Sequence, residues 1–278
     1  MIIWLASYPK SGNTWLRLFL RAYFLSNEKE FSINYEGEHE YEAKTFPNID
    51  LLKNNRINYY EFEQIVKNWI KLQDYVNLNN RINLLKTHNG NFNINGFPFT
   101  NSENTVGGIY IVRDPRDVAL SYANHFNLGH EEVVLNMNNM QNYEFYDKDL
   151  NKGFKISIMG TWASNYNSWR YYQGRSIHLV KYENMINNPE EVFYKVLKYL
   201  NSFMSFEIDK IKIRKAINAT SFSNLKKMEN EKGFKELGSG KEFFRKGTTG
   251  EWRNKLDIKL IKNIEKNFNK EMRELGYI

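Results

Sequence analysis

Residues 1–25 read MIIWLASYPKSGNTWLRLFLRAYFL, and this stretch decides the fold class. The apolar run 2–6 predicts a buried strand, and Pro9 and Gly12 mark a short polar loop after it. From Thr14 onward apolar residues recur at helical spacing, so we predict that a helix starts there. A strand, a loop containing Lys, Ser and Gly, and a helix start form an anion cradle. Free backbone N–H groups and the helix dipole both favour negative charge at that point.

This loop has an ordinary alternative, a strand-to-helix turn whose Lys10 is merely solvated. It is not a Walker A loop, because the spacing Gly-x-x-x-x-Gly-Lys-Ser/Thr is absent. The whole chain carries 39 Lys and Arg against 32 Asp and Glu, a net charge of +7. That charge favours an anionic ligand or partner, and nucleic acid, an anionic membrane and a charged nucleotide all fit it.

Length and composition are those of a globular protein with a sizeable core. The chain has 278 residues, of which 41% are hydrophobic and 15% aromatic. It contains no cysteine, so neither a disulfide framework nor a thiolate metal site can form. No uncharged run approaches the ~20 residues that span a bilayer, and residue 1 leads directly into the first strand. We therefore expect a soluble, cytoplasmic protein with no membrane span.

Two further predicted strands end in polar residues. The run 82–88 carries Lys86 and His88 at its end, and the run 109–112 is followed by Arg113. In open α/β sheets ligands lie beyond the carboxyl ends of the strands, which would place these side chains at a site. Each also has an ordinary alternative. A lone His is more often structural, and Arg113 could pair with the aspartates that follow it, one of which, Asp114, suits a helix N-cap before Pro115.

The remaining chain alternates between apolar periodic segments and polar ones. We predict helices over 61–72, 158–172, 211–217 and 256–275 and after Pro189, a strand over 176–181, and a helix with a long loop, which could form a mobile flap, over 131–155. Trp162 and Trp169 are expected to pack in the core, and Arg116 to lie on the surface. Residues 26–52 look irregular, and Tyr35, Tyr41 and Phe46 within them either line a substrate cleft or simply pack.

The segment YPKSGNTW at 8–15 closely resembles the 5′-phosphosulfate loop of the soluble sulfotransferases, whose donor is 3′-phosphoadenosine 5′-phosphosulfate (PAPS). The family usually has Thr where this chain has Asn13, and both side chains can donate a hydrogen bond. Three more motifs follow in order: KTH at 86–88, the run from Arg113 to Ser121, and RKGTTGEW at 245–252, with Glu251 where the family has Asp. The segments 180–185 and 220–225 are also similar to the family, with Leu225 in place of Met.

The resemblance implies one α/β domain over residues 1–278, with a mainly parallel sheet flanked by helices on both faces and a P-loop-like outline. It implies sulfuryl transfer from PAPS to a hydroxyl or amine of a small molecule, leaving 3′-phosphoadenosine 5′-phosphate (PAP), with no metal. The implied donor-binding residues are Lys10, Ser11, Gly12, Asn13, Thr14, Trp15, Arg113, Ser121, Tyr182, Thr220, Phe222, Leu225, Arg245, Lys246 and Gly247.

The implied catalytic residues are His88 as general base, Lys10 and Lys86 as stabilisers of the leaving group, and Ser121, which restrains wasteful hydrolysis of the donor. An unperturbed His pKa of about 6.5 suits a base at neutral pH. Arg245 and Lys246 followed by Gly247 also suit an anion on chemistry alone, since Arg offers a fork, Lys a point charge and Gly a close backbone N–H.

Two other functions remain as alternatives. One is a nucleotide-dependent kinase that uses the first loop, although no Asp or Asn pair for Mg²⁺ is evident. The other is a non-catalytic basic module that binds a nucleotide, although no nucleic-acid motif is found and we expect no nucleic-acid partner. The family's dimer motif is not matched, because Asp257, Ile258 and Lys262 stand at its Thr, Val and Glu positions. A homodimer is therefore left open, as is the identity of the acceptor.

Overall fold

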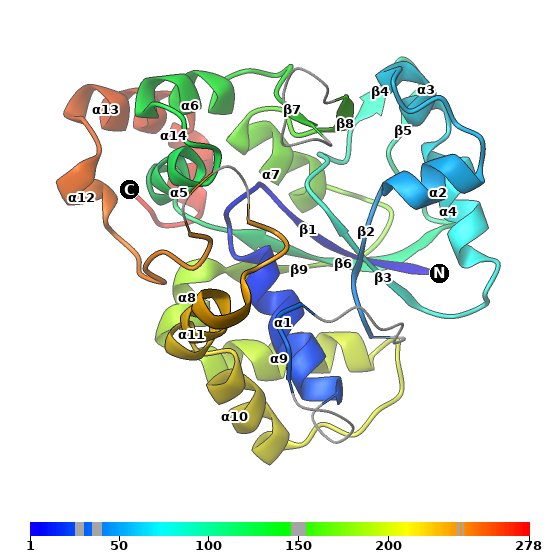
Figure 1. Cartoon of the computed structure of the whole chain (residues 1–278). Helices are drawn as coiled ribbons and strands as arrows, with labels where there is room; N and C mark the ends of the chain where they lie inside the picture. The colour runs from blue at the N-terminus through cyan, green and yellow to red at the C-terminus, as the bar shows by residue number, and fades with distance from the viewer. Residues whose placement is uncertain (26–30, 35–40, 146–153, 238–239, 241) are drawn as a thin grey trace.

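A five-stranded sheet forms the centre of the computed structural model, which describes residues 1–25, 31–34, 41–145, 154–237, 240 and 242–278 (Figure 1). The strand order is β2-β3-β1-β6-β9, and all neighbouring strands run parallel. The strands are β1 (Ile2–Ser7), β2 (Lys44–Thr45), β3 (Asn83–Thr87), β6 (Thr105–Val112) and β9 (Ile177–Lys181). Two small antiparallel pairs lie apart from it: β4 (Asn93–Ile94) with β5 (Phe97–Pro98), and β7 (Tyr143–Phe145) with β8 (Lys155–Ile158).

Strand β1 is buried on both faces, and its alternating side chains enter two separate cores. Ile2, Trp4 and Ala6 join the core on one face, whereas Ile3 and Leu5 join the core on the other. Helices cover both faces (Figure 1), as a parallel sheet requires. The first core packs against α2 (Ile49–Asn54), α3 (Phe62–Lys67), α4 (Trp69–Asn77), α5 (Pro115–Phe126), α6 (His130–Met137), α7 (Trp162–Arg170), α13 (Ile258–Asn267) and α14 (Asn269–Glu274).

The second core packs against α1 (Asn13–Leu25), α8 (Tyr182–Asn187), α9 (Pro189–Asn201) and α10 (Lys210–Ala219). The short helix α12 (Trp252–Lys255) lies beside α5, and α11 (Phe222–Lys232) contributes Leu225 to a third, smaller cluster on the outer side of α1. The prediction of a mainly parallel sheet with helices on both faces is thus confirmed.

Several predicted boundaries shift by local packing and capping. The predicted helix 61–72 is two helices, α3 and α4, which meet at Asn68. The predicted last helix, 256–275, begins only at Ile258, because Leu256 is extended, and it is divided at Phe268 into α13 and α14. Trp162 and Trp169 are fully buried, so their packing role is confirmed.

Of the two alternatives for the aromatic residues in 26–52, packing is confirmed for Phe46 and Tyr41. Phe46 is 1% exposed and packs edge-on against Trp4 in the core. Tyr41 stacks on Phe24 at a centroid distance of 3.8 Å. Tyr35 lies outside the described residues, as do residues 146–153, on which the expected flap depended. The described part of 131–155 includes most of α6, a short turn, the strand β7 and the first residue of β8, and neither strand was predicted.

The expectation that Arg116 lies on the surface is also wrong. Its side chain is only 3% exposed and forms ion pairs with Asp114 at 2.7 Å and Glu265 at 2.5 Å. The guanidinium donates to the carbonyl of Tyr277 at 2.9 Å and lies 3.6 Å from the ring centroid of Trp252. Arg116 therefore ties the start of α5 to the C-terminal helices, which a local sequence pattern could not indicate.

The topology brings the predicted motifs to one edge of the sheet. Strands β1, β3, β6 and β9 end at Ser7, Thr87, Val112 and Lys181, and the segments that follow carry the predicted functional residues. Because the strands are parallel, these ends lie on the same side of the molecule. No helix in the described ranges is long and apolar enough to cross a bilayer.

Candidate active site

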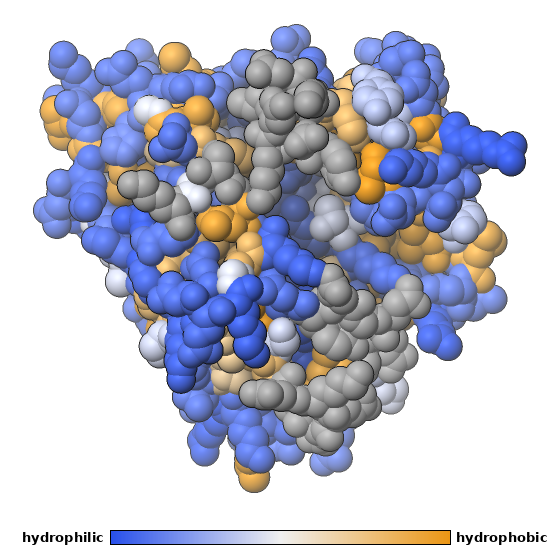
Figure 2. Space-filling model, viewed as in Figure 1, coloured by the Kyte–Doolittle hydropathy of each residue, from blue (hydrophilic) through white to orange (hydrophobic). Residues whose placement is uncertain are grey.

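A cavity of about 550 Å³ opens at this edge of the sheet. Figure 2 shows this face hollowed near its centre, with hydrophilic residues around the hollow. All of the predicted site residues except Ser11 line the cavity: Lys10, Gly12, Asn13, Thr14, Trp15, Lys86, His88, Arg113, Ser121, Tyr182, Thr220, Phe222, Leu225, Arg245, Lys246 and Gly247. Residues separated by more than 200 positions in the sequence thus face one space.

The loop after β1 turns tightly over Tyr182. Gly12 has φ +104°, and a Cβ on it would lie 2.5 Å from the Tyr182 ring, so only glycine fits there. Lys10 also adopts a positive φ, +66°. The hydroxyl of Ser11 is buried and has no hydrogen-bond partner within the described part of the chain, and the same holds for the Nε of Arg113. Unsatisfied donors of this kind fit a site built for an anion.

The side chain of Asn13 points into the protein rather than into the cavity's free space. Its Nδ2 donates to the carbonyl of Leu5 at 2.9 Å and to the hydroxyl of Ser7 at 3.3 Å. Its Oδ1 accepts from the Nε of Arg17 at 3.1 Å. Asn13 therefore anchors the start of α1 to β1 and orients Arg17.

His88 follows directly on β3, and its tautomer is fixed by its neighbour. The Nδ1 atom lies 2.8 Å from the carbonyl oxygen of Ser7, which can only accept, so Nδ1 carries the hydrogen and Nε2 is left as a proton acceptor. Burial, reinforced by the charge of Lys86, lowers the pKa of His88 to about 4. The imidazole is therefore neutral at neutral pH and able to accept a proton.

Two lysines bring positive charge to the cavity close to His88. Burial is the main cause that lowers the pKa of Lys10 to about 7; Glu236 counteracts it, whereas Arg113 and Lys86 add to it. Its Nζ lies 4.0 Å from the ring centroid of Phe243. The Nζ of Lys86 lies 3.8 Å from a carboxylate oxygen of Glu144. Both ammonium groups would gain from a bound anion that replaces lost hydration.

Three further cations meet at another part of the cavity. Arg113 donates to the carbonyls of Lys10 and Thr248, at 3.2 and 3.1 Å. Arg245 and Lys246 share the carboxylate of Glu251, with Lys246 at 2.7 Å. The alternative ion pair of Arg113 with the neighbouring aspartates is wrong. Asp114 pairs with Arg116, and the Asp117 carboxylate accepts from the backbone N–H groups of residues 250 and 252.

Aromatic side chains form the wall beside these cations. Arg113 lies 4.3 Å from the ring centroid of Tyr182, and Tyr182 meets Trp15 edge-on at 6.2 Å. A Cβ on Gly247, which has φ +63°, would lie 2.3 Å from the Phe222 ring, so this glycine brings the cationic segment against the aromatic wall. Thr220 is fully buried, and its hydroxyl donates to the carbonyl of Ala216 at 2.7 Å. A flat, purine-like ring suits such a wall.

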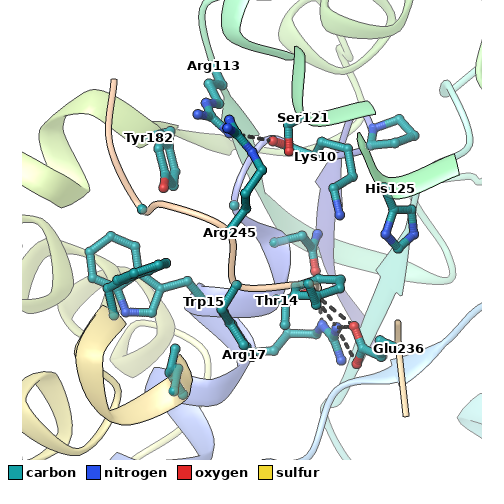
Figure 3. Close-up of a pocket in the computed structure, with 18 of the residues that line it drawn as sticks. Lys10, Thr14, Trp15, Arg17, Arg113, Ser121, His125, Tyr182, Glu236 and Arg245 are labelled. Carbon is teal, nitrogen blue, oxygen red and sulfur yellow. Dashed lines mark hydrogen bonds and ion pairs between the residues drawn. The ribbon is translucent and has the colours of Figure 1, made fainter. Parts of the chain in front are cut away.

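Sequence reasoning missed several residues that line the cavity, among them Arg17, Tyr122, His125, Glu144 and Glu236. Figure 3 shows Arg17, His125 and Glu236. Two of them could have been predicted from helical spacing. Arg17 follows Thr14 by three positions and His125 follows Ser121 by four, which places each pair on one helix face. Glu144 lies on the unpredicted strand β7 and Glu236 in a non-periodic segment, so neither had a local signal.

The missed residues change the electrostatics of the cavity. Burial, with a smaller contribution from Lys10, lowers the pKa of His125 to about 3, so this second imidazole is also neutral. Burial, the largest single cause, would raise the pKa of Glu144, but Lys86 together with His88, Ser157 and His125 outweighs it, so the pKa is lowered. The cavity therefore holds two neutral histidines and charged carboxylates among its cations.

Comparison with known proteins gives a consistent result. The family model for the sulfotransferase domain matches residues 2–276. Cytosolic sulfotransferase 13 of Arabidopsis thaliana is 26% identical over 270 residues, which cover 94% of this chain and 74% of that protein. Flavonol 4′-sulfotransferase of Flaveria chlorifolia is 25% identical over 285 residues, covering 99% and 80%.

Solved structures agree in fold. A mouse sulfotransferase in complex with PAP aligns with a TM-score of 0.61 at 20% identity, covering 98% of this chain and 84% of that one. Retinol dehydratase in complex with androsterone and the inactive cofactor PAP aligns with a TM-score of 0.57 at 18% identity, covering 98% and 80%. The match thus extends over nearly all of this chain.

Proposed function

The chain belongs to the sulfotransferase family, and from this premise we propose that it moves the sulfuryl group of PAPS, in line, to a hydroxyl or amine of a small molecule. As a family member it is an enzyme of sulfuryl transfer. The observation that carries the detailed proposal is that a cation-lined anion cradle and a neutral imidazole share one cavity. PAPS and PAP fit the unsatisfied donors of Ser11 and Arg113, although the acceptor itself has no such signature.

In the proposed reaction, Nε2 of His88 takes the proton from the hydroxyl or amine of the acceptor. At the same time the acceptor's oxygen or nitrogen forms a bond to the sulfur of PAPS. The bond between sulfur and the bridging oxygen breaks, and its electron pair stays on the 5′-phosphate of PAP. Lys10 and Lys86 stabilise the charge that develops on this oxygen and on the sulfuryl group. We assign to Ser121, on α5, the role of restraining hydrolysis of the donor when no acceptor is bound.

The donor site should recognise the 3′-phosphate. We assign this phosphate to Arg113, Ser121, Arg245, Lys246 and Gly247, and charge-assisted hydrogen bonds contribute ~1.5–3 kcal/mol each. PAP should therefore bind at least ~10-fold more tightly than adenosine 5′-monophosphate, which lacks that phosphate. Isothermal calorimetry on one preparation compares the two ligands. Equal affinities would overturn the assignment of the donor.

Turnover should need no divalent metal. The proposed positive charge comes from side chains, and the described residues contain no group of three or more His, Cys, Asp or Glu placed to hold a metal ion. We expect the rate of sulfuryl transfer from PAPS to be the same in EDTA and in added Mg²⁺. Loss of activity in EDTA that Mg²⁺ restores would favour the kinase alternative instead.

We make three broader proposals, on the acceptor, the cellular location and the domain organisation of the protein. We propose a small-molecule acceptor, because the related enzymes include those named for flavonols and for luciferin. Relatives named as cytosolic sulfotransferases support a cytoplasmic location. We also propose one domain over residues 1–278. Incubation with labelled PAPS and a panel of phenols, alcohols, sugars and amines, followed by mass spectrometry, tests the acceptor class directly.

A further inference from the structure

A carboxylate of the protein itself lies against the start of α1. Both oxygens of Glu236 accept from Nη2 of Arg17, at 2.8 and 2.7 Å, and one also accepts from the hydroxyl of Thr14 at 3.0 Å (Figure 3). Burial would raise the pKa of Glu236, but the charge and hydrogen bond of Arg17, together with Lys86 and Thr14, outweigh it, and the pKa falls to about 2. A permanent anion thus contacts the same hydroxyl that we assign to the 5′ end of the donor.

Arg17 is held in place for this contact. Its side chain is 8% exposed, its Nε donates to Asn13, and its Nη2 lies 3.2 Å from the Thr14 hydroxyl. Asn13 is in turn fixed to β1 through the carbonyl of Leu5. The asparagine at position 13, where the family usually has threonine, thus supplies the acceptor that orients this arginine.

Arginine is well suited to the group that the donor brings. Its planar fork can bind two oxygens of a phosphate or sulfate at once. Here a single nitrogen, Nη2, contacts both carboxylate oxygens of Glu236, while Nε is engaged with Asn13. Arg17 is also close enough to the reacting groups to contribute, after burial and Lys86, to the low pKa of His88.

We propose that Arg17 is a further donor-binding residue, whose guanidinium takes oxygens of the 5′-phosphosulfate group, and that the Glu236 carboxylate holds this place until the donor binds. This inference rests on the proposed function. On donor binding Glu236 leaves Arg17 and Thr14, and the phosphosulfate replaces it with more negative charge and more oxygens. The competing interpretation is that Arg17 and Glu236 form a purely structural ion pair between α1 and the segment after α11.

A double-mutant cycle separates the two interpretations. Arg17→Met alone is ambiguous, because it leaves an unpaired carboxylate that would repel the donor. Glu236→Gln alone should bind PAP several-fold more tightly, since the competing anion is gone. The decisive protein is the double variant Arg17→Met/Glu236→Gln. If Arg17 binds the donor, this variant should bind PAP at least ~10-fold more weakly than Glu236→Gln. If the pair is only structural, the two should bind PAP equally.

The ligand adenosine 3′-monophosphate supplies the matched control, because it lacks the 5′ group. Compared with Glu236→Gln, the double variant Arg17→Met/Glu236→Gln should bind PAP more weakly by calorimetry. Its affinity for adenosine 3′-monophosphate should be unchanged. An equal loss for both ligands, or no loss for PAP, overturns the inference while leaving the proposed function intact. The parent protein tests that function separately, since failure to prefer PAP over adenosine 5′-monophosphate would count against the donor site itself.

A conservative variant guards against a folding artefact. Arg17→Lys keeps the charge but loses the fork and the hydrogen bond to Asn13, so it should bind PAP with an affinity between those of the parent and Arg17→Met. Thermal melts of each variant establish that the proteins compared are folded. Full parent affinity in Arg17→Met, with an unchanged melt, would also contradict the inference.

Discussion

Replacing His88 by alanine should slow sulfuryl transfer by ~10²–10⁴ while leaving the affinity for PAP close to that of the parent. The physical reason is a separation of tasks. The neutral Nε2 of His88 is the proton acceptor, whereas the contacts that we assign to the nucleotide phosphates come from Lys10, Arg113, Arg245 and Lys246. Single-turnover kinetics with PAPS and calorimetry with PAP measure the two quantities on one preparation.

The pH dependence of kcat/KM for PAPS should carry the same signature, because this parameter reports groups of the free enzyme. Burial and Lys86 lower the pKa of His88 to about 4, so the base becomes protonated, and the rate falls, only as the pH drops toward that value. Burial lowers the pKa of Lys10 to about 7, so its charge, and with it the rate, is lost as the pH rises through that value. A plateau between these limits is expected.

Lys10→Met provides the contrast to His88→Ala. Lys10 would meet the sulfuryl end of the donor both before and during transfer, so its loss should weaken PAPS binding and also slow the reaction. A structural His88 would behave differently from a base, since its replacement would lower the melting temperature and disturb nucleotide binding. A folded His88→Ala protein that transfers sulfate at the parent rate would remove His88 from the mechanism.

The parts of the fold that the sequence predicted are those determined locally. An apolar run, a glycine-marked loop and a helical repeat follow one another within residues 1–25, and each is visible in a window of a few residues. Gly12 and Gly247 could also be identified locally. Each occupies a backbone position where a Cβ would clash, so the sequence itself carries a glycine there. The strands that end at Thr87 and Val112 were likewise marked by polar residues after an apolar run.

The parts that escaped prediction are determined by contacts between distant segments. Phe46 differs from a cleft-lining aromatic only in that Trp4 and Phe99 surround it, and no local pattern shows this. Glu236 reaches Arg17 across 219 positions, so neither residue indicates the other in the sequence. Asn13 was recognised as a departure from the family loop, but its partner became evident only from the hydrogen bond to Arg17.

Replacing Arg116 by methionine should lower the free energy of unfolding by ~3–5 kcal/mol, because it removes the charge from a buried network and leaves its partners behind. Asp114 is 7% exposed and would lose the guanidinium that neutralises it, and the carbonyl of Tyr277 would lose a donor. A change of this size should lower the melting temperature by roughly 6 °C or more in a protein of this length. Urea denaturation and thermal melts measure both quantities.

Arg253 offers a matched control, because its guanidinium lies 4.5 Å from the ring centroid of the same Trp252 but the side chain is exposed. Arg253→Met removes the same chemical group from the same ring without leaving a buried carboxylate unpaired, so its cost should stay within about 1 kcal/mol. Arg116 does not line the cavity, and its variant should still bind PAP well below its melting temperature. Equal melting temperatures for the two variants would mean that desolvation of the Arg116 pair already cancels its attraction, and that packing around Trp252, rather than charge, joins α5 to the C-terminal helices.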